Sequence, residues 1–278
     1  MTERERLTED ELIKTHDEEL VQEYKEMIKE SIEICREFEG CLLDGLEDEE
    51  YMSNLETNIR SKVVDTLKTA HTITINDVAT LIGLKESEKE LPNGRKVKSV
   101  EWSPKNLEPA YKTVDGLRSE AGLGRNDCVT IDGGSPTFVL PTVSHAFHPS
   151  YTAYNMPQQT GDKIAVPLSG AQVEGEGAGQ DLNYEITEKD DYVVVEFKLD
   201  KPQIDVMETV KTLKAPETPG GKGVCITGRG PVAIATALAE AYAHKAPFVA
   251  NFVPGLGYVV SISHDKNNPL GTVIENNN

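Results

Sequence analysis

The sequence predicts an α/β fold in which two copies of a small α/β unit follow an acidic helical segment. In the C-terminal half, an apolar run ends in glycine and continues into a run with the spacing of a helix. A related pattern occurs earlier in the chain. The charge is also uneven: residues 1–60 hold 20 Asp and Glu against 7 Lys and Arg, a difference of −13 in a chain of net charge −19. These observations predict the order acidic helices, first unit, second unit.

Residues 1–90 form the expected acidic helical segment. Near its beginning, apolar residues recur at helical spacing through a charged background. These positions are Leu20, Tyr24, Ile28, Ile32 and Cys35. They predict a helix with one apolar stripe, which either packs on its own domain or binds a partner. Both interpretations stay open.

The end of this segment has the outline of a helix-turn-helix or winged-helix unit. A helix is expected from Ile59 to Ala70, a link over Thr72–Asn76, a short helix over Asp77–Leu84, and a hairpin turn at Leu91–Arg95. The short helix carries no Arg, Lys, Asn or Gln to contact base edges. The net charge opposes binding to a nucleic-acid backbone. The sequence therefore argues against DNA as a partner.

Other classes of protein are excluded by composition. The first residues are charged and no apolar stretch is long enough to span a bilayer, so we expect no membrane partner and a cytoplasmic location. The four cysteines match no zinc or redox spacing, which predicts neither a disulfide nor a zinc site.

An internal duplication follows the helical segment. Val97–Trp102 and Tyr192–Leu199 are both β-rich runs, each followed by a helical stretch and then by an apolar strand ending in glycine. A shift of 95 positions pairs Glu101 with Glu196, Trp102 with Phe197, Val129 with Val224, Gly133 with Gly228 and Pro136 with Pro231. The first copy is expected at 95–170 and the second at 184–278, with a flexible Gly-rich linker over 171–183.

The turn between strand and helix is the expected ligand site in both copies. In the second copy Pro231 is expected at the first helical position, directly after a glycine–arginine–glycine turn. The free N–H groups of such a helix favour an anion, and glycine lets a phosphate approach the backbone. The expected ligand-binding residues are Gly228, Arg229, Gly230, Gly133, Gly134 and Ser135. A tight connection without a ligand has the same local pattern.

The second copy resembles the CRISPR-associated ring nucleases of type III systems, small dimeric proteins that bind and degrade cyclic tetra-adenylate. The resemblance runs over residues 184–274, and the first copy at 95–170 is more diverged. It is carried by Val193–Phe197, Gly228–Pro231, Ala246–Ala250, Leu256–His264 and Gly271–Ile274. It implies a Rossmann-like fold related to CRISPR-associated sensors, dimers or head-to-tail homo-oligomers, and an Mn²⁺-stimulated phosphodiesterase that ends antiviral signalling.

The resemblance also implies catalytic roles for His244 and His264, which fit the two histidine positions of the family. The Asp and Arg of the family's turn are replaced by Val253 and Gly255. Their loss removes a base or metal ligand and a donor to phosphate. Any metal ligands are therefore unknown. His145 and His148 of the first copy, three positions apart, are too few for a metal site on their own.

Two functions remain open from the sequence. The chain is either a ring nuclease for cyclic tetra-adenylate or a related cyclic oligoadenylate, or a non-catalytic sensor or sponge for the same ligand. In the second case the N-terminal helices would be the output or partner-binding module.

Overall fold

The computed structural model describes residues 47–90, 96–157 and 162–276. The chain divides into two compact units, residues 1–55 and 56–278. Of the first unit, the described part is the beginning of helix α2 (Glu47–Ala70). The apolar stripe expected at Leu20–Cys35 lies outside the described residues. The second unit carries the remaining described elements.

The second unit is α/β, as the sequence predicts. Its helices are α3 (Ile75–Leu81), α4 (Leu107–Ala121), α5 (Val139–Ala146), α6 (Val206–Lys211) and α7 (Val232–Tyr242), with a 3₁₀ turn η1 at Pro104–Asn106. Its strands are β1 (Thr72–Thr74), β2 (Glu86–Glu90), β3 (Lys96–Val100), β4 (Cys128–Asp132), β5 (Tyr151–Pro157), β6 (Lys163–Pro167), β7 (Gln172–Val173), β8 (Leu182–Glu188), β9 (Tyr192–Leu199), β10 (Lys214–Ala215), β11 (Gly223–Gly228), β12 (Phe248–Val253), β13 (Gly257–Ser263) and β14 (Val273–Ile274). No described helix has the length and apolar character needed to cross a bilayer.

Two sheets dominate the second unit. The strand order is β1-β4-β5-β6 in the first and β14-β13-β12-β11-β9-β8 in the second. In the first sheet β1, β4 and β5 are parallel and β6 is antiparallel to β5. In the second, β9, β11 and β12 are parallel and β13 is antiparallel to β12. The order and directions of β1-β4-β5-β6 thus match those of β9-β11-β12-β13. This agrees with two copies of one unit, although the duplication itself stays a prediction.

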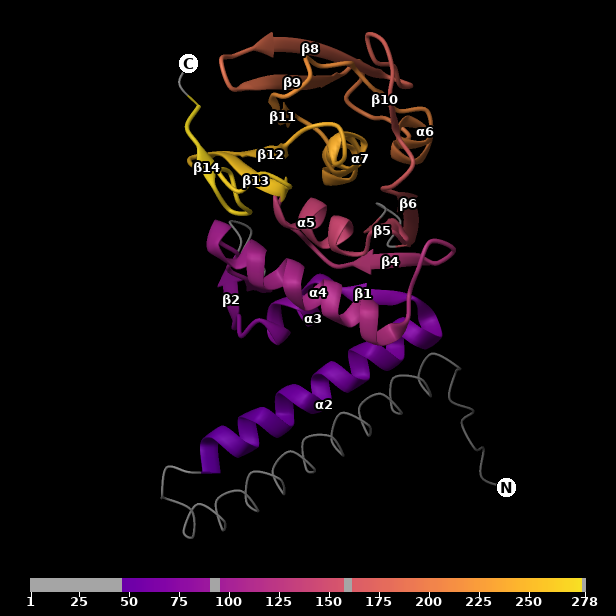
Figure 1. Ribbon diagram of the computed structural model, residues 1–278. Helices are drawn as coiled ribbons and strands as arrows, with labels where there is room; N and C mark the ends of the chain where they lie inside the picture. The colour runs from indigo at the N-terminus through magenta and orange to yellow at the C-terminus, as the bar shows by residue number, and fades with distance from the viewer. Residues whose placement is uncertain (1–46, 91–95, 158–161, 277–278) are drawn as a thin grey trace, which may run out of the picture. The chain divides into compact units, whose positions relative to one another are not determined.

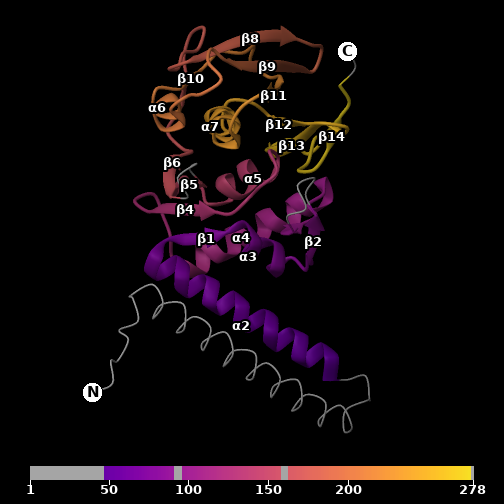
Figure 2. The same ribbon diagram turned by 180° about the vertical axis from the view of Figure 1, so that it is seen from behind.

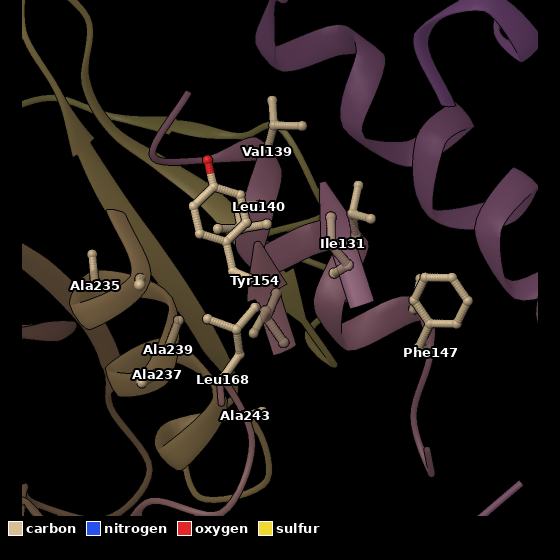
Figure 3. Packing of buried hydrophobic residues seen from close by; sticks show 14 of the residues in the cluster. Ile131, Val139, Leu140, Phe147, Tyr154, Leu168, Ala235, Ala237, Ala239 and Ala243 are labelled. Atoms are coloured by element: carbon tan, nitrogen blue, oxygen red, sulfur yellow. The ribbon is translucent and has the colours of Figure 1, made fainter. Parts of the chain in front are cut away.

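Helices α5 and α7 lie between the two sheets in both views (Figures 1 and 2). Helix α7 is rich in alanine, and Ala235, Ala237 and Ala239 are buried. Figure 3 shows Ala237 and Ala239 beside Leu168, which directly follows β6 of the first sheet. Small side chains let the helix approach the larger ones closely at native packing density. The packing of α7 against α5 also brings the ends of the two helices together.

The first strand of the first sheet is not the one that the sequence suggests. The edge strand is β1, whereas β3 pairs with β2 as a separate antiparallel hairpin. The alignment of Val97–Trp102 with β9 is therefore wrong, because a period-two pattern predicts a strand but not its partner. The paired strands β2 and β3 do flank Leu91–Arg95 as expected, and that turn lies outside the described residues.

The helix-turn-helix outline is also wrong. Its link, Thr72–Thr74, is the strand β1, whose register pairs Ile73 with Ile131 of β4. The helix that follows is capped by reciprocal hydrogen bonds, in which Asp77 N donates to Thr74 Oγ1 and Thr74 N to the Asp77 carboxylate. This capping box begins a helix that packs on the sheet, with Val78 and Ala79 buried.

The expected flexible linker is fixed to the second half of the chain. Within residues 171–183, β7 pairs in parallel with β10, and Ala178 forms a further bridge with Lys214. The glycines of this segment serve turns, since Gly175 and Gly177 both have positive φ. A Gly-rich composition predicted a linker here, whereas the backbone pairing removes that freedom.

Candidate functional site

Both glycine-rich turns lie at one edge of the second unit. The first turn follows β4, and the second begins at the end of β11. Thr137, between the first turn and α5, donates a 3.2 Å hydrogen bond from Oγ1 to the carbonyl oxygen of Phe252. Phe252 lies near the end of β12, which runs parallel to β11. The first turn therefore lies where the strands of the second sheet end. We call Gly133–Ser135 together with Gly228–Gly230 the carboxyl edge.

Arg229 is the exposed cation of the carboxyl edge. Among the described residues, none forms an ion pair or hydrogen bond with its guanidinium. The glycines beside it have a packing reason: a Cβ at Gly228 would lie 2.5 Å from the Phe197 carbonyl oxygen, and one at Gly230 would lie 2.9 Å from the Phe197 ring. Packing against Phe197 therefore explains these two glycines without a phosphate ligand. Helix α7 begins at Val232, so Pro231 is its N-cap rather than its first helical residue.

The first turn is less crowded but carries an acid that the sequence did not single out. The Asp132 carboxylate accepts hydrogen bonds from Lys163 Nζ at 2.8 Å and from Gly133 N at 2.6 Å. Burial raises the pKa of Asp132, but these hydrogen bonds outweigh it and hold the pKa below its ordinary value. A Cβ at Gly134 would meet nothing within 4 Å. The first turn therefore has open space beside a carboxylate whose charge is balanced by Lys163.

Four histidines meet at the opposite end of α5 and α7. His145 lies in the last turn of α5, while His148 and His244 each lie two residues beyond the end of their helix. His264 follows β13, which is antiparallel to β12, and its N–H donates to the carbonyl oxygen of Pro247 just before β12. We call His145, His148, His244 and His264 the histidine cluster. His145 and His148 belong to the predicted first copy, and His244 and His264 to the second.

The histidine cluster combines one buried side chain with three exposed ones. His145 is 5% exposed, whereas the other three side chains are exposed. The distances between ring centroids are 4.6 Å for His148 and His244, 5.4 Å for His145 and His244, 5.5 Å for His145 and His264, 5.6 Å for His244 and His264, and 6.0 Å for His145 and His148. At these distances the rings can exchange protons directly or through one water molecule.

Burial and mutual repulsion favour neutral imidazoles at the surface of the cluster. The pKa of His148 is lowered by burial and then by the charges of His244 and His145. The pKa of His244 is lowered by burial and then by His145 and His264. Glu240 opposes both effects. A neutral imidazole is a base, so the cluster can accept a proton at neutral pH.

The carboxyl edge and the histidine cluster are separated by the length of α7. Arg229 precedes this helix of 11 residues and His244 follows it, a span of about 16 Å at 1.5 Å per residue. A phosphate held by Arg229 is therefore out of reach of the histidines of the same chain. Within a single chain, the expected ligand-binding residue Arg229 and the expected catalytic residue His244 therefore lie at opposite ends of α7, and their roles stay predictions.

The turn with Val253 and Gly255, the two positions at which the sequence departs from the family it resembles, lies close to the carboxyl edge. Val253 ends β12, and Gly255 has φ +81° in the connection to β13. Because His264 lies at the other end of β13, this turn and the histidine cluster are also separated. Within one chain, the positions that the resemblance groups as a catalytic set are divided between two ends.

The cluster does not fit the expectation of Mn²⁺. Mn²⁺ favours oxygen donors, and the cluster offers four imidazoles with Glu240 as its nearby carboxylate. Within residues 47–90, 96–157 and 162–276, no group of three or more His, Cys, Asp or Glu side chains is placed to hold a metal ion.

Sequence reasoning missed Glu240, which contacts His145 from α7. The signal was present, because the shift of 95 positions that pairs Gly133 with Gly228 also pairs His145 with Glu240. Equivalent positions on two helices that pack together can face each other. That relation depends on the packing of α5 on α7, which the local pattern did not show.

Residues 197–275 match a family model described as CRISPR-associated protein (Cas_csx3). Among solved structures, the chain is similar to the Acinetobacter baumannii Cap4 SAVED/CARF-domain containing receptor, solved with the cyclic trinucleotide 2'3'3'-cAAA. The identity is 12% and the TM-score 0.37, and the similarity covers 58% of this chain and 43% of that chain. This chain thus spans less than half the length of the receptor chain it matches.

Proposed function

We propose that the chain binds a cyclic oligoadenylate, such as cyclic tetra-adenylate, at the carboxyl edge. The observation that carries the proposal is the Thr137–Phe252 hydrogen bond, because it brings the two glycine-rich turns to the same edge. A ring of phosphates is symmetric and polyanionic. Two helix N-termini at one edge, with the exposed Arg229 directly before α7, suit such a ligand. The match of residues 197–275 to a CRISPR-associated family supports the same ligand class.

The binding proposal is tested by titrating the protein with cyclic tetra-adenylate in calorimetry at fixed salt. Arg229→Ala should weaken binding about 10-fold or more, since a charge-assisted hydrogen bond contributes roughly 1.5–3 kcal/mol. Lys62→Ala is the matched control, because this exposed cation of α2 belongs neither to the carboxyl edge nor to the histidine cluster. Equal affinity of wild type and Arg229→Ala would remove the site from the carboxyl edge.

A second function, cleavage of the ligand, is favoured by the histidine cluster. A neutral histidine takes the proton from a ribose 2′-hydroxyl, whose oxygen attacks the adjacent phosphorus. The P–O5′ bond breaks, and a protonated histidine donates its proton to the departing 5′-oxygen. The products are a 2′,3′-cyclic phosphate and a 5′-hydroxyl, so no metal, water or redox partner is consumed.

Cleavage would need two chains. Because Arg229 and His244 lie at opposite ends of α7, the ligand held by one chain meets the histidines of another only if the chains stack head to tail. Chromatography of cyclic tetra-adenylate incubated with the protein, with Mn²⁺ in one sample and EDTA in another, separates the outcomes. Linear product in EDTA supports cleavage by the histidines. Tight binding with intact ligand in both samples supports the sensor or sponge.

A further inference from the structure

His145 and Glu240 face each other below the three exposed histidines. The distance from His145 Nδ1 to Glu240 Oε2 is 3.6 Å, with 5% and 12% of the two side chains exposed. Within the described part of the chain, neither His145 Nδ1 nor Glu240 Oε1 has a hydrogen-bond partner. These two buried polar atoms, contributed by the two helices, are unsatisfied at the same place.

Burial makes this pair costly unless the two groups satisfy each other. A buried polar atom without a partner costs roughly 1–3 kcal/mol, and more if it is charged. A separation of 3.6 Å exceeds a hydrogen bond, but a small rotation of either side chain or one bridging water closes it. The His145 Nδ1–H can donate to the carboxylate, whereas an unprotonated Nδ1 would face it lone pair to lone pair.

We infer that Glu240 is a positioning residue that fixes His145 in its Nδ1–H tautomer and leaves Nε2 free to accept a proton from the histidine cluster. This inference deepens the proposed cleavage function, because it names the residue behind the exposed histidines. The geometry of imidazole places Nε2 on the side of the ring away from Nδ1. A carboxylate that orients a histidine through its other nitrogen is a recurrent device in acid–base sites.

The titratable and charged groups around His145 are a tyrosine of α4, the other three histidines, and Glu240 of α7. Helix α4 contributes Tyr111, whose ring centroid lies 6.4 Å from that of His145. The other three histidines contribute rings at 5.4–6.0 Å. Arg125 acts on the cluster through its charge on His148. Glu240 is the anion in contact with His145, so it is the group that can select the tautomer.

The consequence is a relay of one proton. An exposed histidine that takes a proton from a ribose hydroxyl can pass it to Nε2 of His145, while the Nδ1–H of His145 stays directed at the Glu240 carboxylate. The exposed ring is then neutral again for the next step. In this relay the exposed histidines contact the ligand, and the buried His145 holds the proton.

The tautomer is measured by long-range ¹H–¹⁵N NMR of uniformly labelled protein at pH 8, with His145→Gln to assign the signal. We expect the Nδ1–H form in the wild type. Glu240→Gln keeps an oxygen acceptor and should keep this form, while Glu240→Met removes the acceptor and should give a mixture with Nε2–H. Glu208→Met is the control on α6, where the acid is exposed and paired with Lys211. An Nε2–H wild type, or no change in Glu240→Met, would overturn the inference.

A kinetic measurement distinguishes positioning from folding. If the wild type cleaves cyclic tetra-adenylate, Glu240→Met should lower kcat about 100-fold or more with KM within about twofold, and Glu240→Gln should shift the pH profile. An unchanged kcat in Glu240→Met would contradict the relay. If the wild type does not cleave, the proposed cleavage fails while the NMR result still decides the tautomer.

Discussion

At the residue scale, a glycine of the carboxyl edge is required either by packing against its neighbours or by the space that a ligand needs. Replacing it by alanine distinguishes these two roles. A Cβ at Gly228 would lie 2.5 Å from a backbone oxygen of Phe197, which has no means of moving cheaply. We expect Gly228→Ala to lower the free energy of unfolding by about 1–3 kcal/mol, the usual cost of overpacking, as measured by urea denaturation.

The control for that substitution is also a test of ligand contact. A Cβ at Gly134 has open space and a backbone without positive φ, so Gly134→Ala should change the unfolding free energy by less than about 0.5 kcal/mol. Loss of affinity for cyclic tetra-adenylate in this variant then reports a methyl group in the way of the ligand. Equal destabilisation by both substitutions would contradict the packing argument.

The histidine cluster predicts a loss of stability in acid. His148 and His244 have lowered pKa values when folded, so below about pH 6.5, the ordinary value for histidine, the unfolded chain binds more protons than the folded one. Stability is therefore complete above pH 6.5 and falls as the pH drops toward the lowered values. Denaturant midpoints at pH 7.5 and 5.5 should differ less in His244→Asn than in wild type. A larger pH effect in the variant would contradict the sign.

At the element scale, helix α7 depends on its small residues. Ala237 is fully buried between the sheets, whereas Ala241 on the same helix is half-buried. Ala237→Leu should cost about 1–3 kcal/mol through overpacking, measured as a lower denaturation midpoint, and Ala241→Leu should cost less. The reverse order would mean that the helix is rotated from the face seen in Figure 3.

The same scale shows which elements a sequence predicts. β11 and α7 are long, apolar and joined by glycines, so their pattern is sufficient. Strand β1 has three residues, and its role depends on β4, more than fifty positions later. The longer run Val97–Trp102 has the stronger strand pattern but forms a hairpin. Partner choice depends on long-range packing, which propensity does not encode.

The site follows the same rule. Arg229 and its glycines are contiguous, so the sequence can propose them together, whereas the link between His145 and Glu240 requires α5 to pack on α7. The separation of Arg229 from His244 was missed for the same reason, since it depends on which end of α7 each residue occupies.

At the scale of the whole molecule, two ends with different chemistry predict that two defective chains can repair each other. Arg229→Ala chains lack the proposed ligand contact but keep the histidines, and His244→Ala chains keep that contact but lack one histidine. If cleavage occurs between stacked chains, an equimolar mixture should convert cyclic tetra-adenylate faster than either variant alone, with a rate that rises more than linearly with protein concentration. The double variant mixed with wild type is the control for dilution. A mixture no faster than the sum of its parts would place binding and cleavage within one chain, against the span of α7.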